Sequence, residues 1–218
     1  GFTVISARYG DLLLAVSSIM MKLLMIFSYF TDGFAYAGEA LTGRYIGAKD
    51  APMVRQTVRW TFVWSMGLAV AFVGIYHFGG VLLLKMMTSD VAVVEASRDY
   101  LPWLVLMPVV GCAAFTWDGI FIGATGSKDM RNSMLWSVVA FAGVWIAGVI
   151  VLNCFQPLSS GIPFASPDLS TVPSDAMPAP TPYGIAAMHI LMGAYFAHLI
   201  ARTVYLTVKS PRIFRFSD

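Results

Sequence analysis

Five long apolar stretches constrain this chain more than any other feature. They cover residues 12–47, 57–84, 99–123, 132–154 and 184–208, and each provides the ~20 residues that an α-helix needs to cross a bilayer. Only 12% of the residues are charged and 58% are hydrophobic, whereas about a quarter of a soluble domain is charged. The sequence therefore predicts an all-α, polytopic transmembrane helix bundle with five complete spans.

The segments outside these stretches predict how the spans are connected. Residues 2–6 are apolar but much too short to cross a bilayer, so we expect a short N-terminal stub left from a helix that has been cut. Residues 155–183 hold seven of the 11 prolines, which favours an irregular loop without a helix. Pro52 suits the first turn of the second span, and Ser89 or Asp90 suits an N-cap ahead of the third.

Basic residues predict the orientation of the chain in the membrane. They gather in residues 44–59, in residues 126–132 and in the C-terminal tail, to which we assign Arg202, and the Pro-rich loop has none. Because positive charge is retained on the cytoplasmic side, we expect a multi-pass protein of the inner cell membrane with a cytoplasmic C-terminus and an extracytoplasmic Pro-rich loop. The net charge of +2 is too small to indicate a nucleic-acid partner.

Two acidic residues fall inside the predicted spans. Asp32 lies about 20 residues past the start of the first span, and Asp118 precedes Lys128 by about three turns, or roughly 15 Å. A charge at membrane depth costs about 2.5–3.5 kcal/mol, so such residues usually face an interior or a wet cavity and belong to an ion or substrate pathway. A protonated acid or a structural hydrogen bond to a neighbouring helix is the alternative.

A polar stripe accompanies Asp32 along one face of its helix. The stripe consists of Tyr29, Asp32, Tyr36, Glu39 and Gly43, spaced by three or four residues. We expect this face to point inward and the opposite one, with Phe27, Phe34 and Leu41, to meet lipid or neighbouring helices. For Glu39, nearer the cytoplasmic end, the alternative is an ion pair with Arg44.

Lys22 lies too deep in the first span to reach the surface easily. It follows Asp11 by about three turns, or roughly 16 Å, so its ammonium group needs an acidic partner or water. Asp32 is about 280° away around the same helix, so we expect Asp118, on another helix, to be the partner.

The sequence carries no motif of a membrane-embedded enzyme. It lacks HExxH, GxSxG and a paired His/Asp motif, so no nucleophile or metal site is indicated. His77, His189 and His198 are single histidines, which are more often packed or hydrogen-bonded than ligands. We expect no enzyme activity and no metal or other cofactor. A non-catalytic membrane subunit stays open as an alternative.

Two sequence motifs resemble those of a known transporter family. They are "DGFAYAGEALTGRYIGAKD" at residues 32–50 and "WDGIFIGATGSKDMRNSM" at residues 117–134. Together they resemble the multidrug and toxic compound extrusion family, and in particular its DNA-damage-inducible branch. The resemblance extends over nearly the whole chain, in order.

The resemblance implies an architecture and a function. In that family twelve helices form two six-helix lobes around a cavity, and residues 1–218 look like the C-terminal lobe, from the end of helix seven through helix twelve. The implied function is export of lipophilic or cationic small molecules, driven by H⁺ or Na⁺ as the coupling ion, together with an N-terminal lobe. Other branches use acids on helices seven and ten, and Asp118 lies on the equivalent of helix ten. A lipid-linked oligosaccharide flippase of the same broad fold is the second transporter reading.

Overall fold

The computed structural model describes residues 11–155 and 182–215, and all the regular structure in these two ranges is helical. The elements are α2 (Asp11–Gly47), α3 (Ala51–Met87), α4 (Val91–Arg98), α5 (Leu101–Gly123), α6 (Ser127–Phe155), α7 (Pro182–Lys209) and α8 (Pro211–Arg215). Helices α2, α3, α5, α6 and α7 are long and apolar enough to cross a membrane. The predicted all-α bundle with five spans is confirmed, whereas the predicted stub and nearly all of the Pro-rich loop lie outside the described residues.

Local sequence explains where several helices begin. Asp50 caps α3 by accepting a hydrogen bond from the Met53 amide at 3.1 Å, and Pro52 lies in the first turn of α3, as predicted. Asp90 caps α4 by accepting from the Ala92 amide at 2.9 Å, which confirms one of the two predicted N-caps. These side chains satisfy backbone amides that a helix start leaves without a partner.

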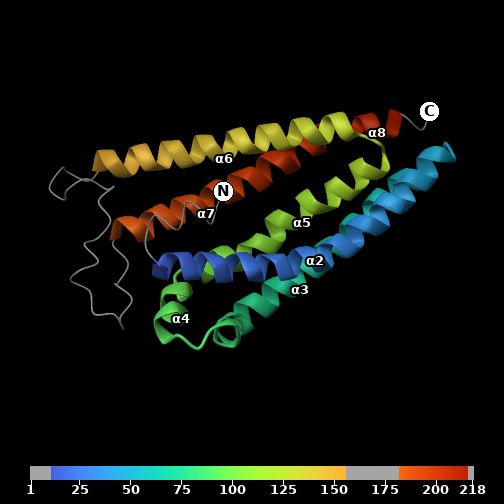
Figure 1. The fold of residues 1–218 in the computed structure, drawn as a ribbon. Helices are drawn as coiled ribbons and strands as arrows, with labels where there is room; N and C mark the ends of the chain where they lie inside the picture. Colours follow the sequence, from blue (N-terminus) through green and yellow to red (C-terminus); the bar gives the residue numbers. More distant parts are fainter. Residues whose placement is uncertain (1–10, 156–181, 216–218) are drawn as a thin grey trace.

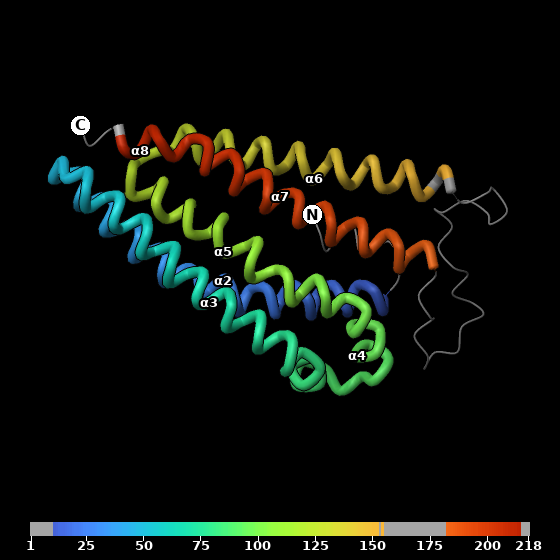
Figure 2. Tube along the Cα trace, turned by 180° about the vertical axis from the view of Figure 1, so that it is seen from behind, coloured from blue at the N-terminus to red at the C-terminus, as the bar shows by residue number. Residues whose placement is uncertain are grey.

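The spans form two groups that meet along α5. Helices α2, α3 and α5 pack together on one side, and α6 and α7 form a pair on the other (Figures 1 and 2). Helix α2 changes direction part-way along its length in both views. Because successive spans alternate in direction, α2, α5 and α7 run parallel to one another. Residues at similar distances from the starts of these three helices therefore lie at similar depths in the bundle.

Glycines bring the backbones of α2 and α5 into direct contact. A Cβ added at Gly119 would overlap the backbone of Ala35, and one added at Gly123 would overlap the backbone of Glu39. The two glycines are four residues apart and so share one face of α5. Such small-residue faces let helices approach closely in lipid, where no hydrophobic effect drives them together.

Polar side chains connect α5 to α7 across the two groups. The Trp103 indole donates to Nδ1 of His189 at 2.9 Å, and the Trp117 indole donates to the Thr207 hydroxyl at 2.9 Å.

Phe27 of α2 is fully buried against Phe72 and Phe115. The interior is therefore aromatic and aliphatic, with individual hydrogen bonds between helices.

We predict that Gly119→Ala destabilises the protein by about 1–3 kcal/mol, because the new methyl group would push α5 away from α2. Thermal melting in detergent measures the effect. Gly67→Ala is the matched control, since nothing lies within 4 Å of a Cβ at that position and alanine favours the helix. Equal melting temperatures for the two variants would contradict the proposed close contact.

Candidate functional site

Asp118 forms an ion pair with Arg202 between α5 and α7. Its Oδ2 lies 2.7 Å from Nη2 of Arg202, and the exposed fractions of the two side chains are 16% and 13%. Asp32 of α2 is close enough to Asp118 for the two carboxylates to interact electrostatically. Three helices therefore bring two acids and one base to the same level of the bundle.

This charged cluster includes buried polar atoms without partners. Asp118 Oδ1 and Arg202 Nε are buried and form no hydrogen bond within the described part of the chain. Unsatisfied buried groups of this kind are costly unless water or an ion reaches them. The arrangement thus offers polar contacts that the surrounding side chains leave unused.

Helix α7 adds two further polar rings beside the ion pair. The rings of Tyr195 and His198 are stacked, with centroids 6.1 Å apart, and Tyr195 lies close enough to Arg202 to interact with it electrostatically. His198 forms a hydrogen bond with the backbone of Ser137 on α6. Tyr195, His198 and Arg202 are spaced by three and four residues and so share one face of α7.

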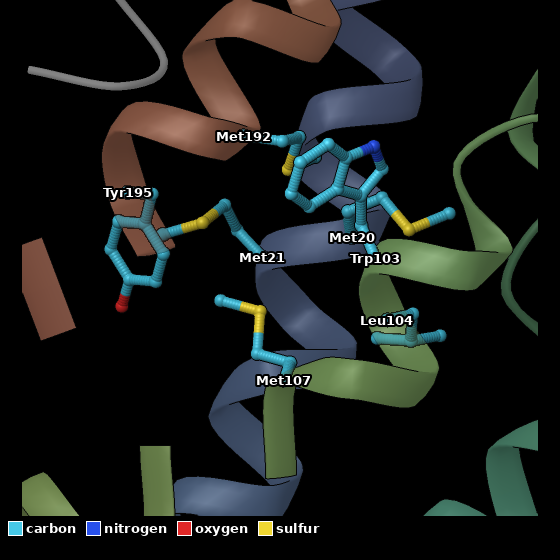
Figure 3. A pocket seen from close by; sticks show the side chains of 7 residues that line it. All are labelled: Met20, Met21, Trp103, Leu104, Met107, Met192 and Tyr195. Atoms are coloured by element: carbon cyan, nitrogen blue, oxygen red, sulfur yellow. The ribbon is translucent and has the colours of Figure 1, made fainter. Parts of the chain in front are cut away.

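A small methionine-rich pocket lies between α2, α5 and α7 (Figure 3), the three helices that carry Asp32, Asp118 and Arg202. We call the interface between these three helices the seam. It is lined by Met20, Met21, Trp103, Leu104, Met107, Met192 and Tyr195. Met21 precedes Asp32, and Met107 precedes Asp118, by about three turns, which returns each pair to the same helix face and separates them by roughly 16 Å. The seam is therefore apolar at one level and charged at a deeper one. The pocket volume of about 10 Å³ is near the lower limit for one water molecule.

The prediction that Lys22 partners Asp118 is wrong. Lys22 is exposed on the bundle, and Arg202 forms the ion pair instead. The assignment of Arg202 to the tail is also wrong, because Arg202 lies within α7, two turns before its end. Its spacing from Tyr195 and His198 along an otherwise apolar helix was the signal that sequence reasoning missed.

The predicted orientation of the polar stripe on α2 also needs correction. Tyr29 and Tyr36, expected to point inward, are 70% and 67% exposed, whereas Phe27 on the opposite face is fully buried against neighbouring helices, one of the two surroundings expected for it. Asp32 and Glu39 are partly buried. The expected alternative partner of Glu39 is also wrong, because Arg44 lies over the Tyr45 ring and the ion pairs of the described residues are those of Asp118 and Asp129. The structure places Asp32 within electrostatic range of Asp118, but it leaves Tyr36 and Lys22 on the surface.

Comparison with known proteins assigns the family. The sequence profile of the MatE family matches residues 2–158. The chain belongs to the MatE family. The expectation from the two sequence motifs is thereby confirmed, and the apolar helices agree with an integral membrane protein. The match includes Asp32 and Asp118 but ends before Arg202.

Two curated relatives are similar to the chain. DNA damage-inducible protein F of Escherichia coli (strain K12) is 38% identical over 140 residues, which cover 64% of this chain and 30% of the relative. Protein DETOXIFICATION 42 of Arabidopsis thaliana is 27% identical over 169 residues, covering 68% of this chain and 32% of the relative. The matched segments thus cover about a third of the length of these relatives. No solved structure gives a significant match.

We predict that Arg202→Gln destabilises the full-length protein by about 3 kcal/mol, because it leaves the Asp118 carboxylate in a nearly buried site without its counter-charge. Thermal melting checks this value. The double variant Asp118→Asn/Arg202→Gln should recover most of the loss, since no isolated charge remains. Arg212→Gln, at the pair with Asp129 where the Arg212 side chain is 56% exposed, is the control and should have little effect. A destabilised double variant would argue against electrostatic pairing as the cause.

Proposed function

We propose that this chain is the C-terminal half of a secondary active exporter that removes lipophilic or cationic small molecules in exchange for H⁺ or Na⁺. Membership of the MatE family and the names of the two relatives, one for DNA-damage induction and one for detoxification, support this proposal. The observation that carries it is the cluster of Asp32, Asp118 and Arg202 inside the bundle.

The charges of this cluster favour binding of one further cation. Two carboxylates face one guanidinium group, so ionised Asp32 and Asp118 leave a net charge of −1. A residual charge at membrane depth is costly, and one H⁺ or one Na⁺ would neutralise it. Asp32 is the acid without a basic partner among the described residues, whereas Asp118 keeps Arg202. The coupling ion therefore binds at or beside Asp32.

The methionine-rich pocket is the proposed start of the substrate site. Methionine side chains adapt to ligands of different shape, and Trp103 and Tyr195 add aromatic surface suited to organic cations. A drug-sized ligand fills several hundred cubic ångströms, so export requires the seam to widen. In the proposed cycle, ion binding near Asp32 changes how strongly α7 is held to α5, and an N-terminal lobe completes the cavity.

The basic residues support a proposed orientation in the inner cell membrane with the C-terminus in the cytoplasm. Lys49, Arg59, Lys128, Arg131 and Lys209 lie near helix ends at the end of the bundle where α8 is found (Figure 1). Although Arg202 lies within a span and does not count toward this total, the remaining basic residues still concentrate at this end. The direction of the ion gradient that drives export, measured in vesicles of known sidedness, would test this orientation.

We predict that Asp32→Asn lowers gradient-driven export about tenfold, a typical size for coupling between two sites. The substitution removes the proposed ion-binding charge but leaves the Asp118–Arg202 pair intact, so folding should be preserved. Uptake of ethidium into everted vesicles that contain the full-length protein, under an imposed H⁺ or Na⁺ gradient, is the measurement. Glu95→Gln, an exposed acid of α4, is the control.

A second variant separates the roles of the two acids. Asp118→Asn should also reduce export. The double variant Asp118→Asn/Arg202→Gln removes both charges of the pair and so leaves no isolated charge to destabilise the fold. Loss of export in the double variant would therefore reflect lost coupling and not lost stability. Export at the wild-type rate by Asp32→Asn and by the double variant would reject a coupling site in this half of the transporter.

A further inference from the structure

A second apolar recess lies on the outside of the α6–α7 pair, separate from the seam that contains the ion pair. It is an open groove of about 910 Å³ between the two helices. Val139 and Ala140 of α6 form one wall, and Ala201 and Val204 of α7 form the other. Val139 and Val204 are each more than half exposed, so in a membrane the groove opens toward hydrocarbon unless another part of the protein covers it.

The groove ends in positive charge at the end of the bundle that carries α8. Tyr205 and Lys209 also line it, and Nζ of Lys209 lies 5.8 Å from the centre of the Tyr205 ring. Asp129, the nearby acid at the start of α6, is already paired with Arg212 at 3.2 Å. Within the described residues no carboxylate lies at ion-pair distance from Lys209, and Lys128 on the first turn of α6 is exposed as well. At the mouth of the groove, Lys209 is thus a cation without a carboxylate partner among the described residues.

We propose that this groove binds one anionic glycerophospholipid, with an acyl chain along the apolar walls and the phosphate at Lys209. Apolar walls alone accept any lipid, so the unpaired lysine at the mouth is what selects a negatively charged headgroup. The lining residues of α7, from Ala197 to Lys209, span about 18 Å along the helix. One leaflet contributes about 15 Å of hydrocarbon, so the groove has the length of a single lipid tail.

The placement of aromatic residues agrees with this occupant. Tyrosine is enriched where hydrocarbon meets headgroups, and Tyr205 lies between the valines of the wall and Lys209. Lysine at such a position extends its methylene stem along apolar surface and keeps its ammonium group at the headgroup level. The proposal does not depend on the transported substrate or on the coupling ion.

Native mass spectrometry of the full-length protein in detergent tests the proposal. Phosphatidylglycerol and phosphatidylcholine with identical acyl chains are titrated separately, and phosphatidylglycerol should be retained more strongly. Lys209→Gln should weaken phosphatidylglycerol retention about fivefold, the scale of one lysine near an anionic headgroup, without changing retention of phosphatidylcholine. Lys85→Gln, at the opposite end of the bundle, is the matched control and should have no effect.

A groove-filling variant tests the acyl chain independently of charge. Ala201→Phe should lower retention of both lipids, because the ring occupies the space between the walls, and Ala140→Phe on the facing helix should do the same. Equal retention of the two lipids by the unaltered protein would overturn the proposal. So would wild-type retention of phosphatidylglycerol by Lys209→Gln, or by both phenylalanine variants, which would mean that another part of the protein covers the groove.

Discussion

The backbone contact between α2 and α5 is the constraint on which the rest of the described structure depends. Gly119 and Gly123 leave no side chain between the helices, so the main chain of α5 lies directly against Ala35 and Glu39. Asp118 immediately precedes the first of these glycines, and Asp32 lies one turn before Ala35. Close packing of two backbones therefore also brings the helix turns that carry the two acids near each other, within electrostatic range. In lipid, such contacts have to come from shape, because the surrounding solvent is as apolar as the helices.

The ion pair compensates for the burial of Asp118 in this packing. Arg202, on the third helix, supplies the counter-charge that the buried carboxylate needs, and it also offsets the weaker repulsion from Asp32. A buried ion pair contributes little net stability relative to apolar packing, so stability alone is a weak reason for its presence. In the proposed exporter, the pair would fix the orientation of Asp118 while leaving the charge of Asp32 unbalanced.

Sequence reasoning predicted the spans, the family and the two interior acids, because each depends on local information. Apolar length identifies a span, and a side-chain carboxylate before a helix identifies a cap, as at Asp90. Helical spacing also identified which residues share a face, but not which face is buried. Tyr29 and Tyr36 carry exposed polar rings, whereas Phe27 fills the core, because in a membrane polarity does not decide which face points inward. The partner of Asp118 was missed for a related reason: it lies on a helix far away in sequence, and a single arginine near the end of an apolar run resembles a membrane-flanking charge.

The position of Arg202 on α7 ties the ion pair to the division of the bundle. The two acids belong to α2 and α5, which the glycine contacts hold as one unit, whereas the base belongs to α7, which packs mainly against α6. Any shift of the α6–α7 pair relative to α2 and α5 must therefore change the distance between Asp118 and Arg202. The hydrogen bonds of Trp103 with His189 and of Trp117 with Thr207 cross the same boundary, so such a shift requires rearrangement of all three contacts. A cation that neutralises Asp32 weakens the field that attracts Arg202 toward the acids. In the proposed cycle, occupancy of the ion site and the docking of α7 on α5 thus influence each other, and by linkage that influence is reciprocal.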